Sequence, residues 1–387
     1  MLQQGAHVQL EPENTTAILY RQIGSRGGEG TVYEINRTGM VAKIYNRPLT
    51  AFNIAKLRHM VADPPADPER KNGHASIAWP DQIVNYKRKP VGFTMPFAIG
   101  VQLVKVLSSK QRREWSPDFS WQGLVLTAAN IATAFENVHA KGYVIGDVKP
   151  DNILVTSEAR VTLVDNDSFQ VVDGRGSIFH SQVYTEGYLA PELMGCDLKT
   201  TARNNSHDLF GLGVLIFKLL LCDAHPFVGV WRSRGEPPSS DDECVRMGAY
   251  VGKKSSLMGP KPTVPRLDSL APSIRELFTL CFDSGYASPN LRPSAKEWRM
   301  ALHDLFRNLS KCHKYPKKHF YYRGVTCPWC KLLTDEGVDY FDAHNGVNGR
   351  MKAQYRSVRV PGAANPVIVI PNPGTRLQSS VIFAFAT

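Results

Sequence analysis

The sequence lacks any hydrophobic run long enough to cross a membrane. Its longest apolar stretch, Leu209 to Cys222, contains Lys218 and is well short of the ~20 residues that a membrane-spanning helix needs. The first five residues also lack the basic and apolar regions of a secretory signal. We therefore expect a cytoplasmic protein that has no membrane partner.

The sequence also lacks a disulfide framework. Seven cysteines is an odd number, and four of them stand singly in apolar or loop sequence: Cys196, Cys222, Cys244 and Cys281. Buried thiols in a reducing compartment fit this pattern better than disulfides. The 387 residues, of which 43% are hydrophobic, are enough to bury a sizeable core in two lobes or domains.

Hydrophobic periodicity predicts a small strand-rich half followed by a larger helix-rich half. The expected strands are Thr31–Ile35, Met40–Tyr45, Gln82–Tyr86 and Val91–Phe97, and the first expected helices are Ala51–Val61 and Trp121–Lys141. Beyond residue 206, further helices alternate with loops rich in proline and glycine. This order is typical of an α+β protein.

No Gly-x-x-x-x-Gly-Lys-Ser/Thr loop is present, but another set of phosphate-handling residues is. In the run from residue 142 to 155, Asp147 is spaced to accept a hydroxyl proton and Lys149 to neutralise a moving phosphoryl group. Asn152 and the later Asp165 are spaced to hold Mg²⁺ against nucleotide phosphates. This pattern predicts phosphoryl transfer from ATP.

A glycine cluster at residues 24–30 lies between two expected strands. Glycines allow backbone N–H groups to approach phosphate oxygens without a Cβ in the way. The strand that follows brings Lys43 under this loop, at the distance needed to reach the α- and β-phosphates. Together, the loop and the lysine predict a nucleotide site.

With these motifs, residues 17 to 309 resemble the eukaryotic-type protein kinase family. Thr185 to Glu192 is similar to the segment that closes the family's activation loop, Asp208 looks like its buried helix-capping aspartate, and Arg292 resembles the arginine that pairs with Glu192. The resemblance implies a two-lobed protein kinase-like fold. It also implies an ATP- and Mg²⁺-dependent serine/threonine kinase that acts on a protein substrate.

The resemblance also implies roles for individual residues. Asp147 would be the catalytic base with Lys149 as its partner, and Asn152 and Asp165 would bind Mg²⁺. Val32 and Ala42 would form the roof over adenine, and Met95 would be the gatekeeper before a hinge at Pro96 to Ala98. The implied nucleotide contacts are Ser25, Gly27, Gly28, Gly30, Val32, Ala42, Lys43, Met95, Phe97, Ala98 and Leu154.

Three departures from the family pattern bear on activity. Ile145-Gly146-Asp147 lacks the arginine that grips a phosphorylated activation loop, so we do not expect activation by phosphorylation of that loop. Asp165-Asn166-Asp167 has lost a glycine pivot and a packing phenylalanine. From Ile44 to Pro68 there is no glutamate to pair with the phosphate lysine, and Ala55 or Lys56 stands about where it should lie. The alternative to an active kinase is a nucleotide-binding pseudokinase scaffold.

A second group of candidate ligands follows the kinase-like region. Cys312, His319, Cys327 and Cys330 have the residue types of a closed tetrahedral Zn²⁺ site, which favours a structural zinc knuckle. His313 is the other candidate for the fourth ligand. The competing interpretation is a redox dithiol, which would need a thioredoxin-like βαβ context that the sequence lacks.

The Cys-Pro-Trp-Cys segment sharpens the resemblance toward a bacterial group of kinase-like proteins that carry it. That group implies a partner phosphatase or a tellurium-resistance-type protein. The net charge is +11, and residues 312–387 hold 10 Lys and Arg against 4 Asp and Glu. Because basic and aromatic residues interleave there, a nucleic-acid-associated adaptor remains an alternative to a solvated face around zinc.

We therefore expect five parts along the chain. They are an N-terminal extension (1–16), a kinase N-lobe (17–98), a kinase C-lobe (99–309), a zinc-knuckle segment (310–344) and a low-structure tail (345–387) with β-prone runs at Val367–Ile370 and Val381–Phe385.

Overall fold

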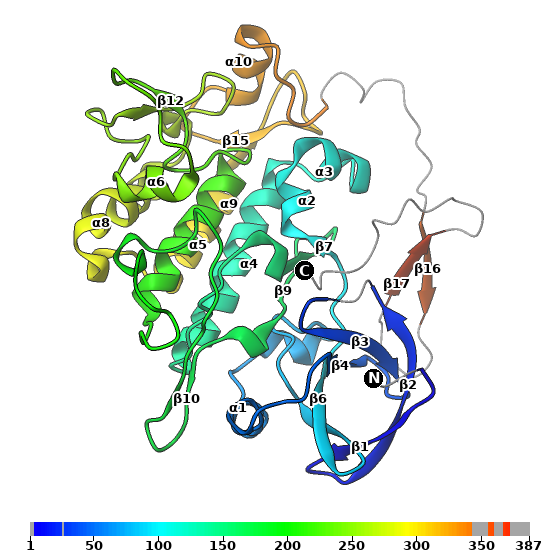
Figure 1. The fold of residues 1–387 in the computed structure, drawn as a ribbon. Helices are drawn as coiled ribbons and strands as arrows, with labels where there is room; N and C mark the ends of the chain where they lie inside the picture. Colours follow the sequence, from blue (N-terminus) through cyan, green and yellow to red (C-terminus); the bar gives the residue numbers. More distant parts are fainter. Residues whose placement is uncertain (1–3, 25–26, 343–354, 360–366, 372–387) are drawn as a thin grey trace.

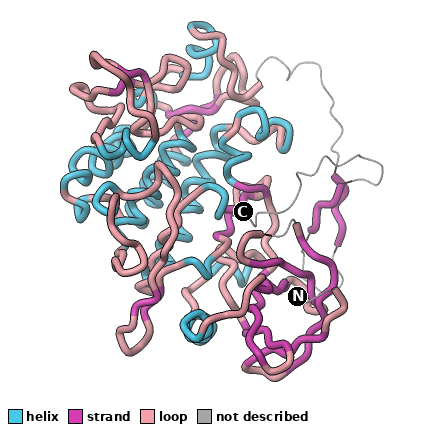
Figure 2. Tube along the Cα trace, in the orientation of Figure 1, coloured by secondary structure: helices cyan, strands magenta, loops and turns pink. Residues whose placement is uncertain are grey.

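The computed structural model describes residues 4–24, 27–342, 355–359 and 367–371. It has the predicted two lobes, one rich in strands and one rich in helices (Figures 1 and 2). Among the described residues, no helix is both long enough and apolar enough to span a bilayer.

The small lobe is a closed antiparallel barrel with the strand order β1-β2-β3-β4-β6-β5. Its strands are β1 (His7–Glu11), β2 (Thr15–Ile23), β3 (Gly30–Ile35), β4 (Met40–Tyr45), β5 (Gln82–Tyr86) and β6 (Lys89–Pro96). Helix α1 (Ala51–Ala62) lies between β4 and β5 in the chain, and Thr50 caps it by accepting a hydrogen bond from the backbone N–H of Asn53 at 3.2 Å.

Strand β1 corrects the expected N-terminal extension 1–16. Val8 and Leu10 alternate with exposed residues and are buried in the barrel interior. The strand pairs with β2 on one side and β5 on the other, which closes the barrel. The N-lobe therefore begins before residue 17, because a barrel without this strand would expose two unpaired edges.

The large lobe is built around three packed helices, α4, α5 and α9. Its helices are α2 (Leu103–Leu107), α3 (Ser109–Trp115), α4 (Trp121–Ala140), α5 (Asn205–Leu220), α6 (Asp241–Arg246), α7 (Pro272–Thr279), α8 (Gly285–Ala287) and α9 (Ala295–Arg307). Its strands are β7 (Val101–Gln102), β8 (Ile153–Val155), β9 (Val161–Leu163), β10 (Val171–Val172), β11 (Ile178–Phe179), β12 (Val230–Trp231) and β13 (Met258–Gly259). Helix α5 is buried on nearly all sides, which explains why it coincides with the longest apolar stretch.

The segment after α9 packs against the large lobe. It contains β14 (Leu309–Lys311), β15 (Phe320–Tyr322) and α10 (Pro328–Asp335). The Trp329 ring lies 5.6 Å from that of Trp121 on α4, and the Arg112 guanidinium donates to the Tyr340 carbonyl at 3.1 Å. Through these contacts, the described part of this segment packs as an extension of the large lobe.

The expected low-structure tail is corrected in part. Strands β16 (Tyr355–Arg359) and β17 (Val367–Pro371) form an antiparallel pair. Strand β17 contains the first predicted β-prone run, Val367–Ile370. The second run, Val381–Phe385, lies outside the described residues.

A buried histidine ties the segment before residue 190 to the large lobe. His225 Nε2 is 2.9 Å from the Gly187 carbonyl, and the Phe227 N–H donates to His225 Nδ1 at 3.2 Å. Neutral imidazole with the proton on Nε2 satisfies both contacts. Burial disfavours the charged form and lowers the pKa of His225 to about 4.

We expect the free energy of unfolding to fall as the pH drops from 6.5 toward 4. Because the folded-state pKa is depressed below that of the unfolded chain, the unfolded chain takes up the proton first, and up to about 3 kcal/mol is lost. Urea unfolding across this range should show a steeper loss in the wild type than in His225→Gln. The exposed His7→Gln serves as the control, and equal slopes in wild type and His225→Gln would contradict the assignment.

Candidate active site

The β8–β9 pairing brings two of the predicted site residues to one place. Ile153 on β8 pairs with Leu163 on β9, and the Val164 N–H donates to the Asn152 carbonyl at 2.9 Å. Asn152 immediately before β8 and Asp165 two residues after β9 are therefore neighbours at one end of this hairpin.

Asp147 lies in the loop between α4 and β8 and is buried. Its Oδ1 accepts a hydrogen bond from the Thr185 hydroxyl at 2.8 Å, and its Oδ2 is 2.8 Å from Lys149 Nζ. The Asn152 side-chain amide donates to the Asp147 backbone carbonyl at 3.2 Å. A carboxylate that receives a hydroxyl on one oxygen and a cation on the other is arranged for general-base chemistry.

Asp208 on α5 fixes the backbone of the loop that contains Asp147. Its carboxylate accepts the backbone N–H groups of Ile145 and Gly146 at 2.7 and 2.9 Å and lies 2.9 Å from His139 Nε2. A buried carboxylate with several donors fixes the backbone around it. Asp208 therefore positions the residue that precedes Asp147.

The segment that contains Thr185 is anchored by an ion pair. Arg292, whose side chain is fully buried, meets both carboxylate oxygens of Glu192 at 2.6 and 2.8 Å. This bidentate geometry is the strong form of an arginine–carboxylate contact. It is the pairing that the resemblance implied.

Lys43 on β4 reaches across to the large lobe. Its Nζ is 2.6 Å from Asp165 Oδ1 and 2.7 and 2.9 Å from the two carboxylate oxygens of Asp167. Burial acts to lower the pKa of Lys43, but the Asp167 and Asp165 charges outweigh it and raise this pKa above its ordinary value. Lys43 is therefore a fixed cation beside Asp165.

The glycine loop is held by a neighbouring side chain. The Asn46 amide donates to the carbonyls of Gly27 and Gly28 at 2.8 and 3.2 Å. At Gly30 a Cβ would lie 2.8 Å from the Ile44 carbonyl oxygen, so this position needs glycine. Ser25 lies outside the described residues.

Apolar side chains share the sheet face that carries Lys43. Val32 pairs with Lys43 across β3 and β4, and Met95 on β6 pairs with Val41. Val32, Val41, Met95 and Leu154 belong to one buried cluster. Phe97 and Ala98, which follow β6, are half-buried. This face provides an apolar surface for a planar base.

The structure corrects the prediction that Ala42 forms part of the roof over adenine. It pairs with Tyr33 and packs inside the barrel with Leu10 and Ala17. Side chains alternate along a strand, so Ala42 points away from the face of Lys43, and Val41 occupies that face instead. Counting two residues back from Lys43 would have found Val41.

The sequence analysis missed three further residues around Lys43. The Tyr45 hydroxyl donates to Asp167 Oδ2 at 2.5 Å. Lys56 on α1 is buried, whereas Ala55 is exposed, and Lys56 Nζ donates to the Asp167 backbone carbonyl at 2.7 Å. Burial lowers the pKa of Lys56 to about 8. The alternation of side chains along β4 would have indicated Tyr45. Lys56 stands about where the sequence lacks the pairing glutamate, but no local signal showed that Asp167 contacts Lys43.

Another arginine fills the space beside Gly146. A Cβ at Gly146 would lie 2.9 Å from Arg203 Nη1 and would clash with Ser181 Oγ. Arg203 is buried, and its Nη2 donates to the Val183 carbonyl at 2.8 Å. The Arg203 guanidinium therefore holds the segment before Thr185, although the Ile145–Asp147 motif itself contains no arginine.

The donor set fits Mg²⁺ and a nucleotide. Asn152 and Asp165 offer the amide and carboxylate oxygens that Mg²⁺ accepts, and Lys43 offers a cation for phosphate oxygens. Carboxylate oxygens of Glu29, Asp165 and Asp167 lie within 4.8 Å of one another. Without a cation, these carboxylates would repel the phosphates of a nucleotide. A divalent cation bound between them would offset this repulsion.

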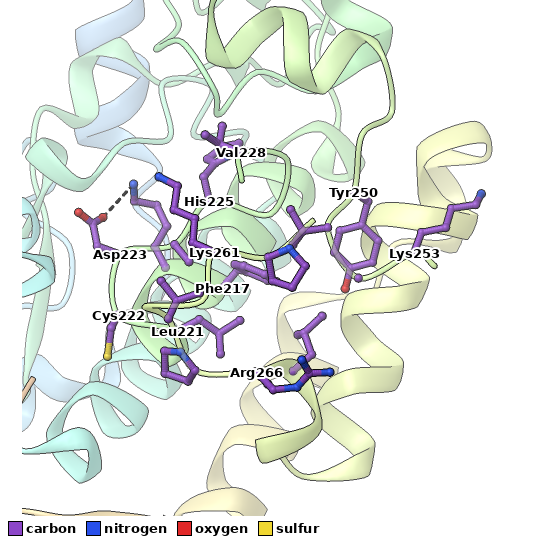
Figure 3. Close-up of a pocket in the computed structure, with 18 of the residues that line it drawn as sticks. Phe217, Leu221, Cys222, Asp223, His225, Val228, Tyr250, Lys253, Lys261 and Arg266 are labelled. Carbon is purple, nitrogen blue, oxygen red and sulfur yellow. Dashed lines mark ion pairs between the residues drawn. The ribbon is translucent and has the colours of Figure 1, made fainter. Parts of the chain in front are cut away.

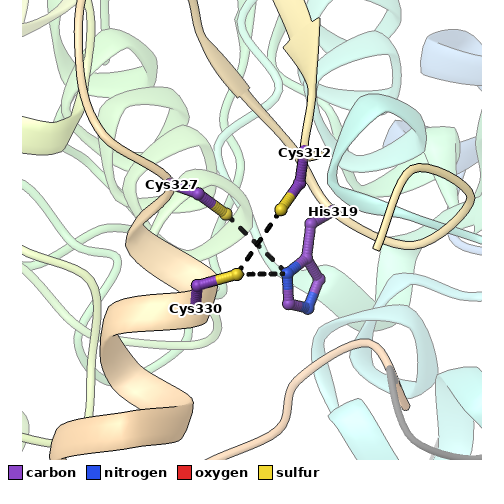
Figure 4. A group of neighbouring side chains, drawn as sticks. All are labelled: Cys312, His319, Cys327 and Cys330. Carbon is purple, nitrogen blue, oxygen red and sulfur yellow. Dashed lines mark hydrogen bonds between the residues drawn. The ribbon is translucent and has the colours of Figure 1, made fainter. Parts of the chain in front are cut away.

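The second cluster lies between β14, β15 and α10 (Figure 4). One ligand atom each from Cys312, His319, Cys327 and Cys330 lies within 4.8 Å of all the others. Cys312 Sγ is 3.4 Å from Cys330 Sγ, and His319 Nδ1 is 3.5 Å from Cys330 Sγ and 3.7 Å from Cys327 Sγ. Tetrahedral Zn²⁺ with ~2.3 Å zinc–sulfur bonds separates two sulfurs by roughly 3.8 Å, so the cluster fits zinc.

Basic residues around this cluster contact their own chain. Lys318 Nζ donates to the Pro117 carbonyl at 2.9 Å and pairs with Asp118 at 3.1 Å. Lys331 pairs with Asp335 at 3.2 Å. These contacts favour a structural face over a nucleic-acid surface at both lysines.

A cavity of about 830 Å³ lies elsewhere in the large lobe (Figure 3). Phe217, Leu221, His225 and Tyr250 line it, as do Lys218 and Asp223, which form an ion pair of 2.9 Å. None of the predicted site residues lines this cavity. The phosphate-handling groups therefore gather elsewhere, between the lobes.

Comparison with known proteins shows the family to which this chain belongs. The protein kinase domain family matches residues 80–303, so the chain belongs to this family. It is 35% identical over 337 residues to protein kinase YegI of Escherichia coli, a match that covers 84% of this chain and 50% of YegI. This similarity supports a bacterial kinase domain of the eukaryotic type.

Weaker similarity extends to other kinases. The chain is 31% identical over 154 residues to serine/threonine-protein kinase PknD of Chlamydia caviae, a match that covers 34% of this chain and 16% of PknD. It is also 31% identical over 137 residues to a probable cAMP-dependent protein kinase catalytic subunit of Encephalitozoon cuniculi, covering 35% and 38% of the two chains. The chain spans about half the length of YegI.

We expect Gly146→Ala to destabilise the protein more than Gly142→Ala. Both glycines have positive φ, 78° and 79°, so each alanine pays a similar backbone cost of about 1 kcal/mol. A Cβ at Gly142 meets nothing within 4 Å, whereas one at Gly146 strikes Ser181 and Arg203. Urea unfolding and limited proteolysis within residues 178–190 would measure the difference. Equal losses would show that the space beside Gly146 is not constrained.

Proposed function

We propose that this chain is an ATP- and Mg²⁺-dependent protein kinase that transfers the γ-phosphoryl group to serine or threonine hydroxyls. The observation that carries the proposal is Asp147, whose two oxygens meet the Thr185 hydroxyl and Lys149 Nζ, each at 2.8 Å. Asp147 therefore accepts a hydrogen bond from a threonine hydroxyl of its own chain. This contact supports an alcohol substrate.

The proposed chemistry uses the chain's residues in fixed roles. Asp147 accepts the hydroxyl proton as the hydroxyl oxygen bonds to the γ-phosphorus, and the bond from that phosphorus to the β–γ bridging oxygen breaks to release ADP. Lys149 offsets charge on the moving group, and Lys43 orients the α- and β-phosphates. Asn152 and Asp165 would hold Mg²⁺, which neutralises phosphate charge when bound.

We also propose that Cys312, His319, Cys327 and Cys330 bind a structural Zn²⁺. Their four donor atoms leave no open position for a substrate, which is typical of structural sites. The ion would join β14, β15 and α10, and so fix Trp329 against α4. The partner phosphatase and the tellurium-resistance-type protein remain predictions from the resemblance.

Asp147→Asn should remove phosphoryl transfer. The amide cannot accept the hydroxyl proton, so incorporation of labelled γ-phosphate into the protein or a generic basic protein should fall about 100-fold to 10,000-fold. Nucleotide binding measured by calorimetry should persist. Asp268→Asn, at an exposed ion pair with Arg266, is the control.

Two results would decide against this function. Wild-type protein that binds magnesium nucleotide without turnover would instead be a pseudokinase scaffold. Phosphate found on tyrosine rather than on serine or threonine would contradict the proposed specificity.

The purified protein should hold about one Zn²⁺ per chain. Cys330→Ser should lose it, because replacing one thiolate opens the tetrahedron, whereas the exposed Cys196→Ser should keep it. Elemental analysis measures the metal, and thermal unfolding with and without a chelator measures its effect. A metal-free protein with a Cys327–Cys330 disulfide would support the redox interpretation instead.

A further inference from the structure

We propose that Asp167 positions the phosphate-binding lysine, in place of an acidic residue on helix α1. This inference rests on the proposed nucleotide site and names a positioning residue within it. No glutamate stands between Ile44 and Pro68, and α1 carries no acidic residue that could pair with Lys43.

The contacts of the Asp167 side chain support this role. Its side chain is only 5% exposed, and its two oxygens lie 2.7 and 2.9 Å from Lys43 Nζ. The Tyr45 hydroxyl donates to Oδ2 at 2.5 Å. Because Lys43 and Tyr45 stand on the same face of β4, Asp167 grips that strand at two points.

Asp165 makes a different kind of contact. It meets Lys43 through Oδ1 at 2.6 Å, and its side chain is 33% exposed. An accessible carboxylate suits the proposed Mg²⁺ role, whereas a buried carboxylate held by a lysine and a tyrosine suits positioning. The two aspartates of the Asp165-Asn166-Asp167 triplet therefore have different proposed roles: Asp165 binds Mg²⁺, and Asp167 positions Lys43.

Helix α1 carries the complementary change. Lys56 is buried at the inward position of α1, and its Nζ donates to the Asp167 backbone carbonyl at 2.7 Å. A lysine cannot pair with Lys43, but it fixes the backbone of the residue that does. The carboxylate that meets Lys43 thus comes from the loop after β9, and the helix contributes a hydrogen-bond donor instead.

We expect that a carboxylate placed at position 56 of helix α1 compensates for the loss of the Asp167 carboxylate. Asp167→Asn removes the charge and keeps the shape, so the nucleotide dissociation constant should rise and kcat/KM should fall about 100-fold, as expected for a misplaced reactive group. Lys56→Glu alone should also weaken binding, because it adds a carboxylate and removes the donor to Asp167. The double variant Lys56→Glu/Asp167→Asn returns a carboxylate to the helix and should recover at least about tenfold of the loss.

The measurements separate positioning from folding. Calorimetry with magnesium nucleotide, well below each variant's melting temperature, gives the dissociation constant of folded protein, and thermal unfolding without nucleotide gives stability. Asp268→Asn is the surface-carboxylate control. A lower melting temperature in Asp167→Asn with an unchanged dissociation constant would overturn the proposal, as would a double variant no better than the sum of the singles.

The same experiment distinguishes this proposal from the proposed function. Wild-type protein that binds nucleotide but transfers no phosphate would reject kinase activity, and the dissociation constants of the variants would still decide the role of Asp167. Wild-type protein that binds no nucleotide would reject both.

Discussion

The ion pairs of the buried Lys43 with Asp165 and with the buried carboxylate of Asp167 join the two lobes at the proposed nucleotide site. Lys43 belongs to the barrel strand β4, whereas both aspartates follow β9 in the large lobe. Taking these charges out of water is expensive, and their attraction offsets that cost only when further hydrogen bonds complete the geometry. Tyr45 and Lys56 supply those bonds.

A second buried carboxylate, that of Asp208, fixes the loop that contains Asp147. Asp208 fixes the backbone at Ile145 and Gly146, so Asp147 is held from the large lobe while Lys43 is held from the small one. The Arg292–Glu192 pair then fixes the segment that presents Thr185. Lys43 and the loop that holds Asp147 are therefore each positioned by a buried aspartate side chain, that of Asp167 and that of Asp208.

Much of the fold was predictable because its signals are local. The strands at 31–35 and 40–45 and the helices at 51–61 and 121–141 follow from hydrophobic periodicity, which is a property of neighbouring residues. Strand β1 is short, and only its pairing with the distant β5 as well as with β2 shows that it belongs to the barrel. Ala42 was placed on the wrong face because the motif was matched without applying the two-residue period of a strand.

The amino-acid sequence by itself was enough to predict which groups carry the proposed phosphate chemistry, because Asp147, Lys149, Asn152 and Asp165 lie close together in the chain, in short loops beside β8 and β9. Only the tertiary structure decided which group holds Lys43. Asp167 is 124 residues from Lys43 and 111 from Lys56 along the chain. Electrostatic attraction depends on distance in space, and folding alone brings the Lys43 ammonium to the Asp167 carboxylate and the Lys56 ammonium to the Asp167 backbone carbonyl.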